Sequence, residues 1–470
     1  MPVITEKNKE EVLKAVQSAG VVGMGGGGFP AHVKFNATVD TVVANGAECE
    51  PLLWSDKSIL LNKPDDVIEG MVLAMELTGA SKGVMAVKGK NADVVTAMES
   101  AIRRNSSAAH GSIQLALLPN TYPMGDEFVL VEQVLGRTIP EMGLPLNVGA
   151  VVSNVATLEA LAGVVRRSEP VTSRIVTVVG EVRNPLTVEV PIGTSFNYLV
   201  DIAGGTSLST PHFVDGGPMM GVHTVDGEET VKKTTSGLLV LPEDHPVVKR
   251  HLTDSSSRLR MAQAACCLCN ECTQVCPRNA LGHRIYPDRL MRSVAAGVVH
   301  DLQSYTGAYY CCECGLCTVY GCPMYLDPCG MNIEIKQRLR EAGVKPPAAD
   351  EAVPSPFFST KQVPINRLMS RLQVSGYSVR CPHIGRAEDP EVVVLYLRQG
   401  AGAPPKSVVK KGMKVCKGDL VAEPDGYVSA GLHASIDGVV QAVDEEKIVI
   451  RLESAPRAEK AQHKPLRIRE

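Results

Sequence analysis

Two runs of cysteine with nearly the same spacing constrain this chain more than any other feature. Eleven of its 14 cysteines lie between Cys266 and Cys329. Three thiolates at two-residue gaps wrap one loop around three irons of a cubane cluster, and a fourth cysteine followed by proline is set back from them. Both runs have this form: Cys266, Cys269, Cys272 and Cys276-Pro277, then Cys311, Cys314, Cys317 and Cys322-Pro323. The spacing predicts two 4Fe–4S clusters.

A pair of zinc ribbons is the alternative, because CxxC pairs also suit tetrahedral zinc. Zinc sites use two CxxC pairs, whereas each run here is a triplet closed by Cys-Pro, which favours the clusters. The runs resemble two-cluster ferredoxins, in which the fourth cysteine binds the other cluster. This resemblance implies one cluster on Cys266, Cys269, Cys272 and Cys322, and another on Cys311, Cys314, Cys317 and Cys276. The four-residue gap before Cys322 departs from the usual three.

Six cysteines lie outside these ligand sets. Cys267, Cys312 and Cys329 are adjacent to the runs and are interpreted as buried thiols or as alternative ligands in a shifted register. Cys381 and Cys416 are isolated, which is typical of small buried residues. Cys49 is also isolated, but it lies between two glutamates of a second motif described below.

Composition excludes several classes of protein. The 48 basic and 51 acidic residues give a net charge of −3, and no basic stripe with interleaved aromatics suggests nucleic acid as a partner. No apolar run is long enough for a membrane helix, and the N-terminus lacks the apolar stretch of a signal peptide. We therefore expect a cytoplasmic protein, in which clustered cysteines bind metal and do not form disulfides. A length of 470 residues predicts three or more domains.

Periodicity divides the chain into segments. We predict helices at 6–19, 66–78 and 288–300, and strands at 38–46, 84–89, 113–119 and 174–182. The predicted segments are an α/β domain at 1–168, a β-plus-helix domain at 169–245, the cysteine domain at 250–345, a proline-rich linker at 346–364, a β-rich domain at 365–455 and a tail at 456–470.

A glycine-rich loop at residues 23–28 is the second informative motif. Its letters match the dinucleotide fingerprint GxGxxG, but that fingerprint requires a strand before it and a helix after it. Here a predicted helix precedes the loop and Phe29-Pro30 follows it, so a Rossmann unit is disfavoured. A run of glycines still lets the backbone approach a flat ligand or a phosphate, and Lys34 could supply a cation. A flexible surface loop is the alternative.

The segments GMGGGGFPAHVK at 23–34 and ANGAECEP at 44–51 resemble the flavin-binding region of the NADH-oxidising subunit of respiratory complex I, and still more the C subunit of Rnf complexes. Segments 122–127 and 154–158 extend the match. The resemblance implies non-covalent FMN with NADH as electron donor. It implies FMN contacts from Gly23, Gly25, Gly26, Lys34, Asn45, Asn154 and Thr157, and catalytic roles on the nicotinamide side for Glu48, Glu50 and Glu127. Solvated surface carboxylates are the alternative for the glutamates.

Two further regions each resemble a known type of domain. Residues 174–206 resemble a soluble-ligand-binding β-grasp (SLBB) domain, which binds a ligand or braces its neighbours, and 214–221 match the Rnf C subunit. The last domain resembles a lipoyl- or biotinyl-type barrel-sandwich hybrid. It has no lysine between Lys417 and Lys447, so we expect no carrier arm and favour a docking role.

The order of these parts resembles the PduS-type cobalamin reductases of propanediol-utilisation microcompartments. The implied fold class is multidomain α/β and α+β: a complex I-like flavin domain, a β-grasp domain, a two-cluster ferredoxin-like helical domain and a barrel-sandwich hybrid. The implied function is NADH-dependent reduction of cobalamin through FMN and two 4Fe–4S clusters. A corrinoid adenosyltransferase and a microcompartment shell protein are the implied partners, with the enzyme inside or attached to a microcompartment. The alternatives are an electron-transfer subunit of an Rnf-type complex and a non-catalytic assembly module.

Overall fold

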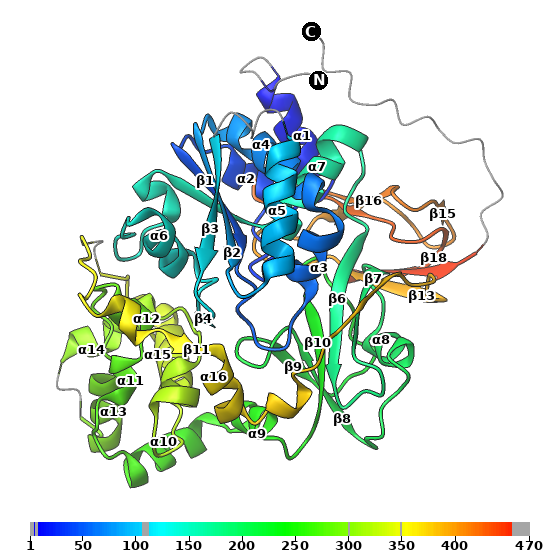
Figure 1. Ribbon diagram of the computed structural model, residues 1–470. Helices are drawn as coiled ribbons and strands as arrows, with labels where there is room; N and C mark the ends of the chain where they lie inside the picture. The colour runs from blue at the N-terminus through cyan, green and yellow to red at the C-terminus, as the bar shows by residue number, and fades with distance from the viewer. Residues whose placement is uncertain (1–3, 5–7, 106–111, 299–300, 348–349, 454–470) are drawn as a thin grey trace.

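The computed structural model describes residue 4 and residues 8–105, 112–298, 301–347 and 350–453. The flavin-like domain, the β-grasp domain and the cysteine domain meet along one another's edges, and the C-terminal module lies beside the first two (Figure 1). Among the described residues, no helix combines the length and the apolar character that crossing a membrane requires. The tail predicted at 456–470 lies outside the described residues.

The first domain is built on a parallel sheet with strand order β3-β2-β1-β5. Its strands are β1 (Thr41–Gly46), β2 (Lys82–Lys88), β3 (Ile113–Leu118) and β5 (Ala150–Asn154), and its main helices are α1 (Lys9–Ser18), α3 (Ser55–Asn62), α4 (Pro64–Thr78), α5 (Ala92–Arg104), α6 (Glu127–Leu135) and α7 (Val155–Arg167). Helices cover both faces, so β1 is apolar and buried through Val42, Val43 and Ala44. The elements predicted in this domain are confirmed in its described part.

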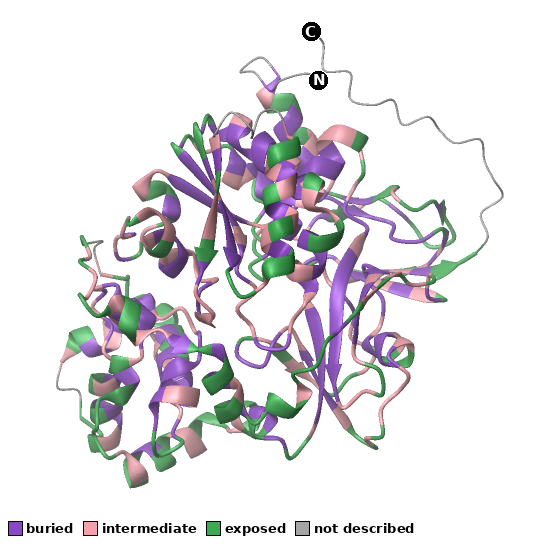
Figure 2. Cartoon of the chain, in the orientation of Figure 1, coloured by how far each residue is buried: buried purple, intermediate pink, exposed green. Residues whose placement is uncertain are grey.

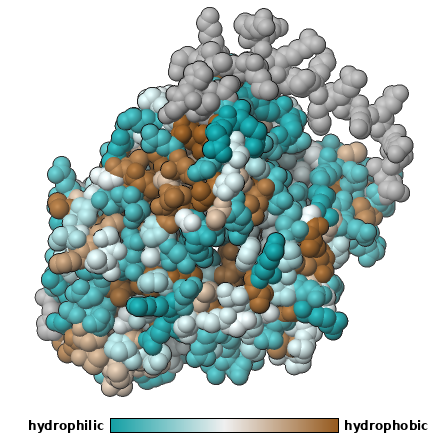
Figure 3. Space-filling model, in the orientation of Figure 1, coloured by the Kyte–Doolittle hydropathy of each residue, from teal (hydrophilic) through white to brown (hydrophobic). Residues whose placement is uncertain are grey.

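The edges of this sheet differ in exposure. The central strands are buried (purple in Figure 2), whereas the edge strand β3 leaves Leu117 61% exposed. Figure 3 shows apolar surface over the region of β2 and β3.

Strand β1 has β2 on one side and β5 on the other, and Asn45 and Asn154 are register partners near the carboxyl ends of their strands. In open parallel sheets, ligands bind where the strand order reverses. This edge is therefore the expected ligand site of the domain.

The β-grasp domain contains a six-stranded sheet of order β12-β7-β6-β10-β8-β9 around the helix α8 (Phe196–Ile202). The strands are β6 (Ser173–Gly180), β7 (Leu186–Pro191), β8 (Pro211–Asp215), β9 (Val222–Thr224), β10 (Gly237–Pro242) and β12 (His383–Arg386). Ser195 caps α8 by accepting a hydrogen bond from the Tyr198 N–H. Strand β12 comes from beyond the cysteine domain, so the sheet also ties the two ends of that domain together.

The cysteine domain consists of short helices joined by the two cysteine loops. Its helices include α9 (Pro246–Leu252), α10 (Ser255–Ala265), α11 (Glu271–Gln274), α12 (Pro277–Ala280), α13 (Pro287–Ala296), α14 (Leu302–Thr306) and α15 (Pro328–Glu341). Helix α13 confirms the helix predicted at 288–300 as far as Ala296, where Gly297 ends it with a φ of +65°. After the proline-rich segment, β11 (Val363–Pro364) pairs with β4 (Thr121–Tyr122), and α16 (Ile365–Leu372) packs in one core with Val248 and Leu316. The segment therefore returns the chain to the first domain.

The C-terminal module is a sandwich of two small antiparallel sheets, β13-β19-β18-β15 and β14-β16-β17. Its strands are β13 (Val392–Tyr396), β14 (Lys406–Ser407), β15 (Lys414–Val415), β16 (Leu420–Glu423), β17 (Leu432–His433), β18 (Gly438–Val443) and β19 (Lys447–Leu452). The module reaches the glycine-rich loop: a Cβ on Gly28, whose φ is +62°, would lie 2.4 Å from the Gly400 Cα. Both positions require glycine for this approach.

One buried lysine joins three domains. The Lys233 amine of the β-grasp domain donates to the Gly20 carbonyl of the first domain at 2.8 Å and to the Gly431 carbonyl of the C-terminal module at 2.6 Å. The Lys233 N–H donates to Gln399 Oε1 at 2.9 Å. Burial lowers the pKa of the Lys233 amine to about 7. The neutral amine retains two hydrogens, enough for both carbonyls.

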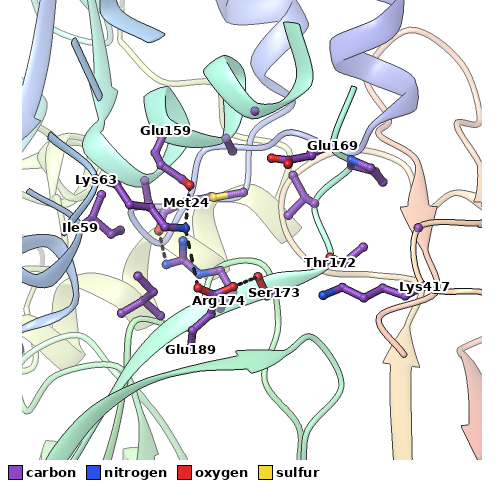
Figure 4. A pocket seen from close by; sticks show the side chains of 17 residues that line it. Met24, Ile59, Lys63, Glu159, Glu169, Thr172, Ser173, Arg174, Glu189 and Lys417 are labelled. Atoms are coloured by element: carbon purple, nitrogen blue, oxygen red, sulfur yellow. Dashed lines mark hydrogen bonds and ion pairs between the residues drawn. The ribbon is translucent and has the colours of Figure 1, made fainter. Parts of the chain in front are cut away.

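The same three domains enclose a cavity of about 430 Å³. Lys63 bridges Glu159 at 2.9 Å and Glu189 at 3.7 Å, while Arg174 and Lys417 enter from the other walls (Figure 4). Three cationic and three anionic side chains line it, so their charges compensate one another. Of the glycine-rich loop, only Met24 contributes to the walls.

We expect Lys233→Met to lower the free energy of unfolding by about 2–4 kcal/mol at pH 9, because two buried carbonyls lose their donor. The folded pKa of about 7 lies below the ordinary value of about 10.4, so the unfolded chain binds more protons between these values and the contribution of Lys233 rises with pH. The difference between wild type and variant should therefore shrink toward pH 6. Urea unfolding followed by circular dichroism measures it, with exposed Lys410→Met as control. An equal deficit at both pH values would contradict the assignment.

Candidate functional site: the glycine-rich loop and the cysteine loops

The glycine-rich loop closes on itself between α1 and β1. The Gly23 N–H donates to the Phe29 carbonyl at 2.8 Å, and the Gly28 N–H donates to the Gly23 carbonyl at 3.0 Å. A Cβ on Gly25 would lie 3.2 Å from the Asn154 Cβ, whereas one on Gly26 or Gly27 would meet nothing within 4 Å. The loop therefore presents bare backbone beside the carboxyl end of β5, as a flat ligand or a phosphate requires.

Two predicted residues fasten this loop to the start of α7. Thr157 Oγ1 accepts a hydrogen bond from the Met24 N–H at 2.9 Å. Asn154 Oδ1 caps α7 by accepting from the Ala156 N–H at 2.8 Å, and its amide donates to Asp56. Asn45, the register partner of Asn154, donates to the Gly125 carbonyl at 3.0 Å. The structure thus brings the glycines, Asn45, Asn154 and Thr157 to one edge of the sheet.

Lys34 and Glu127 lie together at this edge. The Lys34 amine is 2.8 Å from Glu127 Oε1 and donates to the Val152 carbonyl at 2.9 Å. Both side chains are partly exposed. The sequence predicted Lys34 on the phosphate side and Glu127 on the nicotinamide side of one ligand. In the structure the two residues form one ion pair, although the sequence assigned them to different sides of the ligand.

Glu48 holds the start of a helix. Its carboxylate accepts from the Asp56 N–H at 2.8 Å and the Lys57 N–H at 3.1 Å, at the N-terminus of α3. Burial raises the pKa of the Glu48 carboxyl to about 7, with the neighbouring Asp56 charge adding to the shift. These contacts fix the ANGAECEP segment against α3.

Glu50 differs from Glu48, because one of its two carboxyl oxygens accepts no hydrogen bond of ordinary geometry within the described chain. Oε2 accepts from the Met219 N–H at 3.1 Å, whereas Oε1 is buried and accepts no hydrogen bond of ordinary geometry within the described chain, although the Tyr122 hydroxyl lies near the carboxyl. Burial raises the pKa of the Glu50 carboxyl to about 7, against the charge of Arg250. A buried acceptor without a donor is rare in folded proteins. Glu50 therefore has the free acceptor that a ligand's amide could fill.

Sequence reasoning missed Lys88, which joins this group. Its amine donates to the Glu48 carbonyl at 3.0 Å, and burial lowers its pKa to about 8. The neighbouring Cys49 thiol is also enclosed, and burial raises its pKa to about 11. Lys88 is the last residue of β2. Its position at the carboxyl end of a parallel strand was the available signal.

The predicted ligands of the first cluster face one small cavity. Cys266, Cys269, Cys272 and Cys322 all line it, together with Met291 and Leu326. Three come from the first run and one from the second, which is the exchange that the ferredoxin resemblance implies. Burial raises the pKa of the Cys272 thiol to about 12. Cys272 and Cys322 are buried, Cys266 is half-buried and Cys269 is exposed. Because metal binding displaces the thiol proton, four soft thiols around one cavity suit an iron–sulfur cluster.

The second group contains more thiols than one cluster needs. Cys276 packs against Tyr310 and Cys311, as its predicted role requires. Cys329 interacts with both Cys311 and Cys317, and its hydrogen bond with Cys311 is the main reason that the pKa of Cys311 lies well above its ordinary value. Cys329 is at the first turn of α15, where its N–H donates to Thr318. No three described His, Cys, Asp or Glu side chains are close enough to hold a single ion.

The flavin-like domain and the second cysteine loop are in direct contact. The buried Tyr122 hydroxyl donates to the Cys314 carbonyl at 2.9 Å. Arg278, which follows Cys276-Pro277, forms an ion pair with Asp126 at 2.8 Å and lies 3.4 Å from the centre of the Phe128 ring. Met219, whose N–H binds Glu50, also approaches Gly315 of the cysteine loop.

Four family descriptions match consecutive parts of the chain. They are the Nuo51 FMN-binding domain at 16–163, the SLBB domain at 175–223, the 4Fe-4S dicluster domain at 265–327 and the RnfC barrel sandwich hybrid domain at 377–455. The predicted fold class is confirmed. The predicted FMN and 4Fe–4S clusters are confirmed at the level of these domains, and the individual contact residues remain predictions.

Relatives match over nearly the whole length. Cobalamin reductase PduS of Salmonella typhimurium is 38% identical over 448 residues, which cover 94% of this chain and 96% of the relative. The chain belongs to the PduS cobalamin reductase family. The Citrobacter freundii member is 36% identical over the same shares. The C subunit of the Na(+)-translocating ferredoxin:NAD(+) oxidoreductase complex of Acetobacterium woodii is 34% identical, over 58% of this chain and 59% of the relative.

We expect Gly25→Val to lower the FMN content of the purified protein, because the new side chain would collide with Asn154. Gly376→Val is the matched control, since a Cβ at Gly376 meets nothing within 4 Å and its φ is not positive. Flavin released by acid, measured per chain, gives the result. Full flavin occupancy in Gly25→Val would show that the loop is not the site.

We expect Cys276→Ser to lose one cluster and thus about half of the iron, because a harder oxygen replaces a soft thiolate. Cys329→Ser should keep both clusters if Cys276 is the fourth ligand of the second cluster. Iron and acid-labile sulfide in anaerobic preparations decide between the two thiols, with the isolated buried Cys381→Ser as control. Loss of iron in Cys329→Ser alone would transfer the ligand role to Cys329.

Proposed function

We propose that this chain takes electrons from NADH and delivers them singly to cobalamin. The observation that carries the proposal is the buried contact between the flavin-like domain and the second cysteine loop, through Tyr122 and Cys314. Electrons need such a short connection between a flavin and a cluster. The names of the PduS relatives, which match 94% of the chain, support the corrinoid as acceptor. The match to the Rnf relative covers only 58%.

The residues of the first domain bind and orient the two nucleotides. The bare backbone of 23–28 and the Lys34 amine receive the phosphate side of FMN. The unused Glu50 Oε1 accepts a hydrogen bond from the nicotinamide carboxamide and so presents the hydride-bearing face. FMN supplies the conversion between a hydride and single electrons, and the clusters supply one-electron carriers. One NADH and two cob(II)alamin give NAD⁺, a proton and two cob(I)alamin.

The reactivity of the product indicates which partner protein this chain needs. Cob(I)alamin is strongly reducing and would be lost to side reactions unless it were consumed where it forms. A corrinoid adenosyltransferase is therefore the proposed partner, which takes the product directly. The PduS relationship supports a place inside or attached to a microcompartment, with a shell protein as a second partner. A pull-down that captures no adenosyltransferase would count against this part of the proposal.

Removing a cluster ligand should separate the two half-reactions. We expect Cys314→Ala to retain bleaching of the flavin by NADH and to lose NADH-dependent reduction of cob(II)alamin at least about a hundredfold, because its electrons have no carrier beyond the flavin. Stopped-flow absorbance measures both steps, with Cys381→Ala as control. Wild-type cobalamin reduction by a flavin-loaded Cys314→Ala protein would refute the cluster route. A wild-type protein that oxidises NADH with artificial acceptors but never reduces cobalamin would refute the acceptor.

A further inference from the structure

A second cavity, of about 340 Å³, opens where α9, α10 and α16 meet the second cysteine loop. Figure 1 shows these three helices together at the base of the molecule. Apolar walls come from Val247, Met261, Val319 and Leu372, and Tyr325 stands at the edge with 74% of its surface exposed. We call this the exit cavity. It is separate from the glycine-rich loop and from the cavity of Figure 4.

The exit cavity carries uncompensated positive charge. Lys249, Arg250, Arg258 and Arg371 line it, against Asp244 and Asp327. Arg258 is paired with Asp327 at 2.9 Å. Lys249, Arg250 and Arg371 form no ion pair within the described chain. The Arg371 guanidinium makes long hydrogen bonds of 3.4–3.5 Å with the Val319 and Cys322 carbonyls and the Tyr325 hydroxyl, and it lies 5.2 Å from the centre of the Tyr325 ring. Its charge is therefore available to an anion.

The cavity also lies on the segment that contains predicted ligands of both clusters. Val319 forms part of its wall two residues after Cys317, a predicted ligand of the second cluster. Arg371 contacts the carbonyl of Cys322, a predicted ligand of the first. Residues Cys317–Gly321 form a π-helix, and Tyr325 has a φ of +56°. Both conformations are uncommon and concentrate at functional sites.

We propose that the exit cavity receives the corrinoid acceptor, with its phosphodiester near Lys249 and Arg371 and an edge of its macrocycle against Tyr325. This inference rests on the proposed function and locates the acceptor's site. Cobalamin combines one phosphodiester with a large, flat ring, which matches a cationic rim beside an exposed aromatic side chain. The cavity takes one edge of the ligand, and the cobalt faces the cysteine loop. Clusters held by the cysteine loops would supply one electron to cobalt in each step, and each NADH would return two electrons to the protein.

Arg371→Glu tests this site against a matched control on the same helix. Arg367 is exposed one turn earlier in α16 and does not line the cavity, so Arg367→Glu makes the same charge change outside the site. Binding of cyanocobalamin to oxidised holoprotein, measured by equilibrium dialysis, should weaken at least about tenfold in Arg371→Glu and remain unchanged in Arg367→Glu. Lys249→Glu is a second variant, and flavin and iron contents confirm that each protein is loaded.

Cobinamide, which lacks the phosphodiester, provides the second arm. We expect wild type and Arg371→Glu to bind cobinamide alike, because the lost contact is with the phosphate. Equal cyanocobalamin binding by wild type, Arg371→Glu and Lys249→Glu would overturn the site while leaving the proposed function intact. Sensitivity to these variants only toward a protein acceptor would also overturn it, in favour of protein docking. Absence of NADH-driven cobalamin reduction by wild type would instead remove the proposed function.

Discussion

The hydrogen bond from the Tyr122 hydroxyl to the Cys314 carbonyl is the contact on which the arrangement of the redox parts depends. It is buried, so losing either partner leaves a polar atom without water. Arg278 supports it by pairing with Asp126 in the same segment of the first domain. Because Arg278 follows Cys276-Pro277 directly, both cysteine loops are held against one stretch of the flavin-like domain. The cysteine loops are therefore held against the flavin-like domain by buried side-chain contacts.

A different constraint holds the opposite side of the molecule. Lys233 satisfies carbonyls of two other domains, and Gly28 meets Gly400 at a distance that admits no side chain on either. Both contacts hold the C-terminal module against the region of the glycine-rich loop. A module without a carrier lysine thus has a structural use, since it supports the loop's backbone. The docking role expected from the sequence fits these contacts.

Sequence patterns predicted the domains and motifs of this protein more fully than they predicted the contacts between them. The ferredoxin resemblance implied that Cys322 joins the first triplet, and Cys322 lines one cavity with those three cysteines. The pairing of Lys34 with Glu127 and the burial of Lys88 depend on strand order, which no local motif encodes. Cys329 lies outside both runs and was interpreted as a buried thiol or an alternative ligand, and α15 brings it to Cys311 and Cys317. The exit cavity is formed by the consecutive helices α9 and α10 together with α16 from far along the chain, so only the folded chain reveals its charge.

The loop at 216–221 contacts the flavin-like domain, the second cysteine loop and a residue of the exit cavity. On one side Met219 binds Glu50, where the nicotinamide is proposed to lie, and on the other it approaches Gly315. Arg250 contacts the same loop through the Pro218 carbonyl while it lines the exit cavity. The proposed nicotinamide site and the proposed corrinoid site therefore share one short segment of the β-grasp domain without sharing a cavity. In the proposed route, this separation keeps the two-electron donor away from the one-electron acceptor, and electrons pass between them through the cysteine loops.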